Sequence, residues 1–158
     1  MKKLSLAIIA LASLLLIIFY GKNDDMSSIE VGDKVPRFAL KDQNGIPFIV
    51  NSEMGKAMVI YFYPKDDTPC CTIEAQDFTK KIKAFEKLDC VILGVSKDTV
   101  QKHCNFIEKY KLGFNLLSDP EGETCERYGV IKEKSMFGKK YLGIDRTTIL
   151  IDKLGKIT

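Results

Sequence analysis

The sequence contains one histidine and no two cysteines in a C-x-x-C or C-x-x-x-C arrangement. A single histidine argues against a zinc site built from cysteine and histidine, and the missing C-x-x-C pair excludes a thioredoxin-type redox motif. The five cysteines are odd in number and irregularly spaced, unlike the disulfide framework of a small secreted protein. They are Cys70, Cys71, Cys90, Cys104 and Cys125. We expect neither a metal nor a cofactor.

The chain also lacks a strong excess of charge of one sign. It has 158 residues, with 24 lysines and arginines against 21 aspartates and glutamates, which gives a net charge of +3. So small a surplus gives no reason to expect a nucleic-acid partner. The hydrophobic content of 46% is enough for an ordinary core. The part after the N-terminus suits one domain.

One long hydrophobic run is present near the N-terminus. Leu4 to Tyr20 is a stretch of 17 residues without a charge, and two lysines precede it. A membrane-spanning helix needs about 17–25 such residues, whereas the apolar region of a signal peptide has about 7–15. We therefore predict that residues 1–25 are a hydrophobic helix and linker, retained as a membrane anchor or uncleaved signal.

This anchor predicts a bacterial protein whose domain faces the periplasm, because the two lysines would stay on the cytoplasmic side. The alternative is that translation starts at Met26, which opens a sequence typical of a soluble protein. The protein would then be cytoplasmic.

The most informative stretch leads from a strand into a helix. Residues 57–62 are an apolar run rich in strand formers, which ends before Pro64. Beyond Cys71, apolar residues recur at spacings of three and four, as on one face of a helix. Thr68 is the expected N-cap of this helix and Pro69 its first residue. Cys71 then lies in the first helical turn, where unpaired N–H groups favour a thiolate.

Glu74 lies one turn after this cysteine, and its carboxylate disfavours a second negative charge nearby. A reactive thiolate at Cys71 is therefore expected to need a cation from elsewhere in the chain.

The same stretch resembles the active site of a known family. Pro64, Thr68 and Cys71 match the P-x-x-x-T-x-x-C motif of the peroxiredoxins. The longer run PKDDTPCCTIEA is similar to the site of the peroxiredoxin Q, or bacterioferritin comigratory protein, subfamily, in which glycine occupies the position of Cys70. Other matching segments follow in the same order, from about Val31 to the end of the chain. They are VILGVSKD, FNLLSDPEG, YGV and GIDRTTILIDKLGKI.

The resemblance implies a thiol-dependent peroxidase that reduces hydrogen peroxide and organic hydroperoxides. Cys71 would attack the peroxide and become a sulfenic acid, which thioredoxin or another thiol must finally reduce. Thr68 and Arg146 would hold the peroxide together with backbone N–H groups, and Pro64 would shield the thiolate. An arginine suits this role because its charge is permanent and its fork bonds two atoms at once. We expect a monomer.

The position of the resolving cysteine is left open. Many members carry it five residues after the peroxidatic cysteine, where this chain has Gln76. Some carry it on the following helix, as Cys104 would be here. Without it, the enzyme would be a one-cysteine type that needs an external thiol. A thioredoxin-fold thiol–disulfide exchanger, or a redox or copper carrier, is the alternative function, against which the missing cysteine pairs count.

Alternating apolar runs and helical patterns predict an α/β domain over residues 26–158. Through the resemblance this becomes a thioredoxin-like fold, a central mixed sheet flanked by helices, to which the family adds a C-terminal helix that is apparently missing here. The expected strands are 38–40, 46–50, 57–62, 90–95, 147–151 and one from 156, and residues 112–117 are expected to approach or enter another. The expected helices are 69–88, 99–110 and 123–128. Residues 132–140 are expected to form a polar loop or part of a hairpin.

The helix 99–110 carries its apolar residues on one face. These are Val100, Cys104, Ile107 and Tyr110. His103 is expected on the solvent side of this helix.

Overall fold

The structure is a computed structural model that describes residues 29–158. The predicted N-terminal helix and linker of residues 1–25 lie outside the described residues. Within residues 29–158, no helix is long and apolar enough to cross a membrane. The elements are β1 (Phe38–Asp42), β2 (Pro47–Val50), β3 (Ala57–Phe62), α2 (Pro69–Lys87), β4 (Cys90–Ser96), α3 (Val100–Tyr110), β5 (Asn115–Ser118), α4 (Glu123–Arg127), β6 (Ile131–Met136), β7 (Lys139–Ile144) and β8 (Thr147–Ile151).

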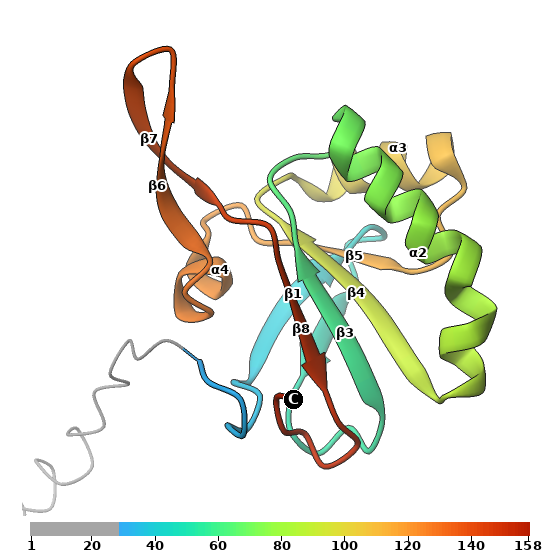
Figure 1. The fold of residues 1–158 in the computed structure, drawn as a ribbon. Coiled ribbons are helices and arrows are strands. Elements are labelled where there is room, and N and C mark those ends of the chain that lie inside the picture. The colour runs from blue at the N-terminus through green and yellow to red at the C-terminus, as the bar shows by residue number, and fades with distance from the viewer. Residues whose placement is uncertain (1–28) are drawn as a thin grey trace, which may run out of the picture.

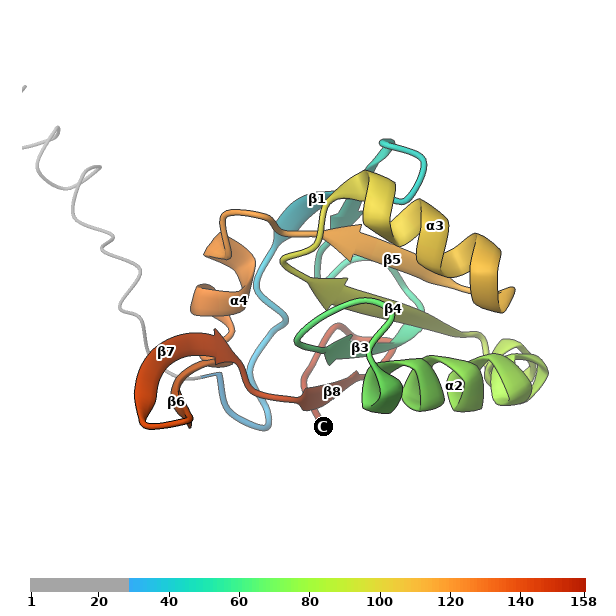
Figure 2. The same ribbon diagram turned by 90° about the horizontal axis from the view of Figure 1, so that it is seen from above.

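The main sheet is mixed and has the strand order β2-β1-β5-β4-β3-β8. Strands β3, β4 and β5 are parallel, whereas β8 is antiparallel to β3 and β1 is antiparallel to β5. The helices α2 and α3 connect the three parallel strands and cover one face of the sheet, while α4 lies on the other side (Figures 1 and 2). A central mixed sheet flanked by helices is therefore confirmed.

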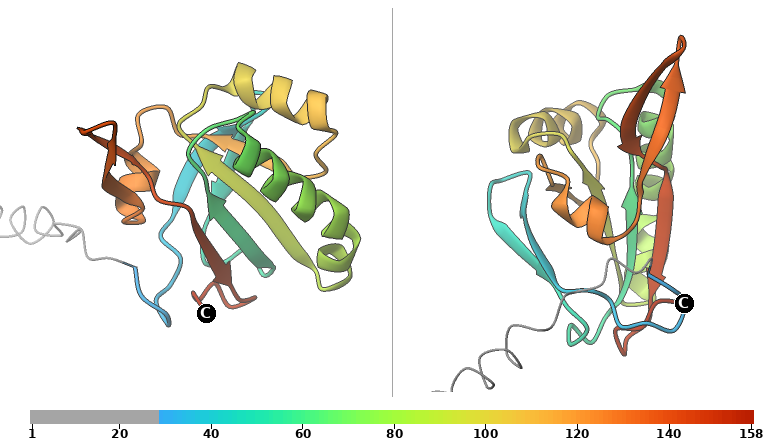
Figure 3. Two further views of the ribbon diagram at one scale, coloured as in Figure 1. Left: turned by 45° about the horizontal axis from the view of Figure 1, so that its top comes forward. Right: turned by 90° about the vertical axis from the view of Figure 1, so that its left-hand side faces the viewer.

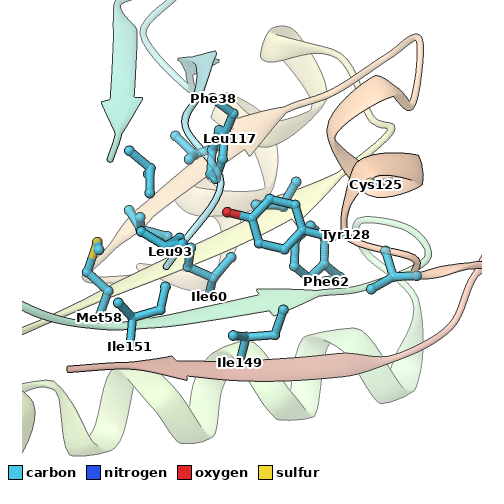
Figure 4. Packing of buried hydrophobic residues seen from close by; sticks show 14 of the residues in the cluster. Phe38, Met58, Ile60, Phe62, Leu93, Leu117, Cys125, Tyr128, Ile149 and Ile151 are labelled. Carbon is cyan, nitrogen blue, oxygen red and sulfur yellow. The ribbon is translucent and has the colours of Figure 1, made fainter. Parts of the chain in front are cut away.

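The central strand β3 is buried on both faces. Successive side chains of a strand point to opposite sides, so its residues divide between two clusters. On β3, Ile60 and Phe62 face the side of α4, where they pack with Tyr128 and the buried Cys125 (Figure 4). Tyr61 belongs to the opposite cluster, which α2 and α3 cover. The continuous apolar run of β3 is thus the pattern of a strand that is buried on both faces.

Strand β4 carries a glycine where neighbouring side chains come close. A Cβ atom at Gly94 would lie 2.6 Å from a methyl carbon of Leu116 and 2.8 Å from the ring of Tyr61. Tyr61 and Gly94 are direct partners in the β3–β4 register. Because Gly94 has no side chain, the ring of Tyr61 can pack beneath helix α2, where it stacks on Phe78.

Strands β6 and β7 pair only with each other and form a hairpin that extends away from the main sheet (Figures 1 and 3). Phe137 at its turn is 97% exposed. Of the two expectations for residues 132–140, the hairpin is the correct one. Its C-terminal strand leads directly to Arg146 and then to β8.

Several expected strands differ from the structure by one or two residues at an end. The segment 112–117, expected to approach or enter a strand, does both: Leu112 and Phe114 pack in the cluster beneath α2 and α3, and the chain enters the sheet at Asn115. The strand expected from residue 156 is reduced to two isolated bridges, in which Lys156 pairs with Lys34 and Ile157 with Ile151.

Candidate active site

The loop between β3 and α2 brings the motif residues to the start of α2. Pro69 is the first residue of this helix and Cys71 the third. Cys71 is only 2% exposed and packs against the cluster beneath α2, whereas Cys70 is exposed. Neighbouring residues on a helix point about 100° apart. The two adjacent cysteines therefore have different environments, and only Cys71 points into the protein.

Thr68 is the N-cap residue, as expected, but its side chain does not cap the helix. Its hydroxyl instead donates a hydrogen bond of 3.1 Å to the carbonyl of Lys65 in the loop. Thr68 therefore tightens the loop rather than accepting a first-turn N–H group. Pro64, which the resemblance assigns to shielding the thiolate, is exposed at the start of the loop.

The guanidinium of Arg146 lies between Cys71 and Glu74. Its Nη2 donates a hydrogen bond of 3.2 Å to Sγ of Cys71, and its Nη1 forms an ion pair with the Glu74 carboxylate. The structure thus brings together three residues that the sequence separates by up to 75 positions. The cation that the sequence analysis required near Cys71 is Arg146.

Cys71, Glu74 and Arg146 form a triad in which neighbouring charges shift the pKa values of the carboxyl group and the guanidinium. Partial burial raises the pKa of Glu74, and attraction to Arg146 opposes that rise without cancelling it. Burial lowers the pKa of Arg146, but its contacts to Cys71 and Glu74 outweigh this and leave the pKa raised. Arg146 therefore stays charged beside the sulfur, while Glu74 holds the guanidinium in place.

A groove of about 450 Å³ opens beside this triad. Cys70, Glu74 and Arg146 form its polar end. Further along the groove, α2 contributes apolar and charged side chains. The apolar ones are Ile73, Phe78 and Phe85, and the charged ones are Asp77 and Lys81. The groove therefore offers a polar end near the reactive sulfur and three apolar side chains farther along α2.

A buried polar group that was not expected from the sequence lies beneath the loop. His103, expected to be exposed, is 0% exposed, and its Nδ1 lies 2.7 Å from Oδ2 of Asp66. The prediction was wrong because the buried side of α3 is formed by His103 and Phe106. The residues of the expected apolar face, among them Cys104, are only half-buried. No local pattern announces this contact, because His103 and Asp66 lie 37 residues apart in the sequence.

All five cysteines are free thiols. The Cys104 thiol faces Glu108 at 3.7 Å, and desolvation together with this carboxylate raises the pKa of Cys104. Cys90, expected to be a core residue, is half-buried, and burial raises its pKa. In residues 29–158, no cluster of three or more histidine, cysteine, aspartate or glutamate side chains is arranged to hold a metal ion.

Comparison with known proteins places this site in a family. Residues 31–158 match the AhpC/TSA family. The chain belongs to the AhpC/TSA family. It is 50% identical over 131 residues to the putative peroxiredoxin bcp of Coxiella burnetii, which covers 83% of this chain and 87% of that protein. It is 48% identical over 130 residues to peroxiredoxin Bcp of Bacillus subtilis, covering 82% and 83% of the two chains.

A solved structure of the Xanthomonas campestris bacterioferritin comigratory protein aligns with a TM-score of 0.73 and 39% identity. The alignment covers 80% of this chain and 85% of that one. The resemblance to peroxiredoxin Q and the thioredoxin-like fold are thereby confirmed. The protein is an enzyme, a thiol-dependent peroxidase of the peroxiredoxin type.

Proposed function

We propose that Cys71 is the peroxidatic residue and that Arg146 orients the peroxide against it. The observation that carries this assignment is the hydrogen bond of 3.2 Å from Arg146 to the Cys71 sulfur, at the first turn of α2. The Cys71 thiolate attacks one peroxide oxygen, and the O–O bond breaks. The other oxygen leaves with a proton as water or an alcohol, and Cys71 becomes a sulfenic acid.

Thr68 and Pro64 shape the approach to Cys71 in this proposal. The hydrogen bond from Thr68 to Lys65 fixes the loop, so that its hydroxyl oxygen remains able to accept from a peroxide. Donors that face the departing oxygen stabilise its developing charge, and Arg146 supplies such donors. Pro64 limits the access of water to the thiolate.

The substrates are hydrogen peroxide and organic hydroperoxides. The groove beside the site supports the second class, because Ile73, Phe78 and Phe85 would contact the organic part while the peroxide group meets Arg146. Alkyl peroxide reduction is the activity ascribed to the bacterioferritin comigratory protein of Xanthomonas campestris.

Peroxide consumption in the presence of thioredoxin tests this function. We expect turnover of hydrogen peroxide and of an alkyl hydroperoxide, and no catalysis of insulin disulfide reduction. The opposite pattern would assign the protein to thiol–disulfide exchange instead.

Cys104 is the proposed resolving cysteine. It lies half-buried on α3 rather than inside the core, so its thiol needs less rearrangement to become accessible than a core thiol would. Condensation of the Cys71 sulfenic acid with the Cys104 thiol releases water and leaves a disulfide that thioredoxin reduces. The Cα atoms of a disulfide lie within about 7 Å of each other. In this proposal the first turn of α2 unwinds so that Cys71 comes within this distance of Cys104.

Peptide mapping of peroxide-treated protein tests the resolving step. We expect a peptide in which Cys71 and Cys104 are joined, and loss of thioredoxin-dependent turnover in Cys104→Ser. A fully active Cys104→Ser variant would instead establish a one-cysteine enzyme with an external thiol.

We also propose that Leu4 to Tyr20 anchors the protein in the membrane, with its domain facing the periplasm. The protein is proposed to be a monomer. The 17 uncharged residues after two lysines support the anchor. Full-length protein should then remain with membranes after carbonate extraction, and a chain starting at Met26 should not. Native protein whose first residue is Met26 would establish the cytoplasmic alternative.

A further inference from the structure

The loop that carries the active-site motif is tied to α3 by a buried carboxylate. Asp66 lies in the middle of this loop, and its side chain accepts a hydrogen bond of 2.6 Å from the Tyr63 hydroxyl. The other carboxylate oxygen lies 2.7 Å from Nδ1 of His103 on α3. Because a carboxylate that already accepts from Tyr63 offers only lone pairs, the histidine nitrogen donates here. Two donors from separate elements therefore satisfy one buried acidic group.

The contact between Asp66 and His103 is shielded from solvent, because both residues are buried. The Tyr63 hydroxyl lies 3.4 Å from Nδ1 of His103 and is a second polar neighbour of that atom. Within residues 29–158, Nε2 of His103 has no hydrogen-bond partner. Burial raises the pKa of Tyr63, and the charges of Tyr61 and Asp66 raise it further. The Tyr63 hydroxyl therefore keeps its proton and remains a donor.

Further contacts hold the same short segment. The N–H group of Asp66 donates a hydrogen bond of 2.7 Å to the carboxylate of Asp98, a residue that follows β4. The next residue, Asp67, has a positive φ of 56° and accepts hydrogen bonds from Lys109 and Tyr110 on α3. These last contacts are exposed, and exposed ion pairs contribute little. Loss of the buried Asp66–His103 contact would leave one oxygen of a buried carboxylate without its side-chain donor, which costs more.

We propose that Asp66 and His103 form a latch that holds the 64–68 loop on α3 and so keeps Cys71 in its buried position beside Arg146. They are positioning residues, because among the described residues no hydrogen bond joins either of them to the sulfur. This inference rests on the proposed function of Cys71 and adds the residues that maintain its reactive arrangement.

The latch also bears on the resolving step. His103 is adjacent in sequence to Cys104, so one helix holds the loop and carries the proposed second thiol. The residue that holds the loop and the proposed resolving cysteine are thus neighbours on α3.

Alkylation of Cys71 by a bulky maleimide measures how often the loop opens, because Cys71 is buried when the loop is closed. All variants carry Cys70→Ser, which removes the exposed neighbouring thiol, and the modified residue is identified by peptide mass spectrometry. The protein is reduced and no peroxide is present. In His103→Leu we expect the Cys71 alkylation rate to rise about 10- to 100-fold, because the Asp66 carboxylate loses a buried donor.

Three variants separate the latch from a general loss of packing. His103→Asn retains a donor near the Nδ1 position and should stay within about threefold of the parent. Phe106→Leu removes apolar packing on the same side of α3 and should lower overall stability without selectively exposing Cys71. Tyr63→Phe removes the other donor and should accelerate alkylation several-fold, which tests the proposal even if His103→Leu does not fold.

An unchanged rate in both His103→Leu and Tyr63→Phe would overturn the latch. Equal acceleration in His103→Leu and His103→Asn, or in His103→Leu and Phe106→Leu, would assign the effect to packing and would also overturn it. A protein that consumes no peroxide would contradict the proposed function, while the alkylation result would still stand.

Discussion

The first turns of α2 and α4 each place a buried cysteine at the third helical position. Cys71 in α2 is 2% exposed and Cys125 in α4 is 0% exposed. Their charged neighbours are opposite. Arg146 donates to the Cys71 sulfur, whereas the Asp119 carboxylate accepts the N–H group of Cys125 at 2.8 Å. Burial raises the pKa of Cys125, and Asp119 raises it further.

The comparison separates burial from reactivity. Asp119 uses a first-turn N–H group of α4, which would otherwise favour a thiolate, and adds a negative charge. At α2 the Thr68 side chain leaves the first turn uncapped, and the nearest charge is positive. Two cysteines at the same helical position thus differ in the charges around them, and only one environment suits a nucleophile.

The largest expected effect comes from removing each thiol in turn. Cys71→Ser should reduce peroxide turnover to background, because Cys71 carries the sulfur that Arg146 contacts. Cys70→Ser and Cys125→Ala should retain most of the turnover. A thioredoxin-coupled peroxide assay measures all three. Loss of activity in Cys70→Ser with activity retained in Cys71→Ser would reverse the assignment.

Replacing Arg146 with glutamine removes the positive charge beside Cys71 and so makes the surroundings of its sulfur more like those of Cys125. Arg146→Gln should slow the reaction of the Cys71 thiolate with peroxide about a hundredfold, the scale of losing one well-placed donor at a developing charge. Arg146→Lys keeps the charge without the fork and should recover only part of the rate. The measurement is the second-order rate constant at a pH where the thiol is ionised. A constant that does not change would restrict Arg146 to stabilising the thiolate.

The α4 cysteine should affect stability and not chemistry. Cys125→Ala removes a buried sulfur from the cluster around Tyr128, and the cavity should cost about 1–2 kcal/mol of unfolding free energy. Urea denaturation measures this loss, with the peroxidase rate constant of the same variant as the control. A rate constant that falls with unchanged stability would show that Cys125 is more than a packing residue.

The smallest effect concerns Glu74, the negative neighbour of Cys71. The pKa of Glu74 is raised above its ordinary value of 4.5 in the folded protein. Protonation of Glu74 therefore favours the folded state, and this contribution is fully present at pH values below 4.5. It is lost as the pH rises through the raised pKa. Glu74→Gln removes the titration, so the variant should gain stability relative to the wild type between pH 4 and pH 7. We expect at most about 1 kcal/mol, because the pair with Arg146 is partly exposed. Denaturation midpoints at the two pH values measure it, and a gap that widens toward low pH would contradict the assignment.

The sequence predicted the elements whose patterns are local. The start of α2 at Pro69 follows from a proline after a capping residue, and β3 follows from an apolar run buried on both faces. Arg146 was placed at the site only through the family resemblance, since a contact across 75 residues leaves no local pattern.

Long-range polar contacts account for most of the errors. His103 appeared on the polar side of its helix, and its burial depends on Asp66, which reaches it from another loop. The Thr68 contact is local instead: its hydroxyl donates to the carbonyl of Lys65, three residues earlier, and its side chain makes no cap hydrogen bond. Periodicity reports which residues are apolar, but it does not identify the polar partners that make burial of a charged group favourable.

The most direct test of the account is to identify which sulfur a peroxide oxidises first. Reduced protein is treated with one equivalent of hydrogen peroxide in the presence of a diketone that traps sulfenic acid, and the peptides are mapped by mass spectrometry. We expect a single adduct on Cys71, with Cys70 and Cys125 unmodified. An adduct on Cys70, with Cys71 unmodified, would contradict it.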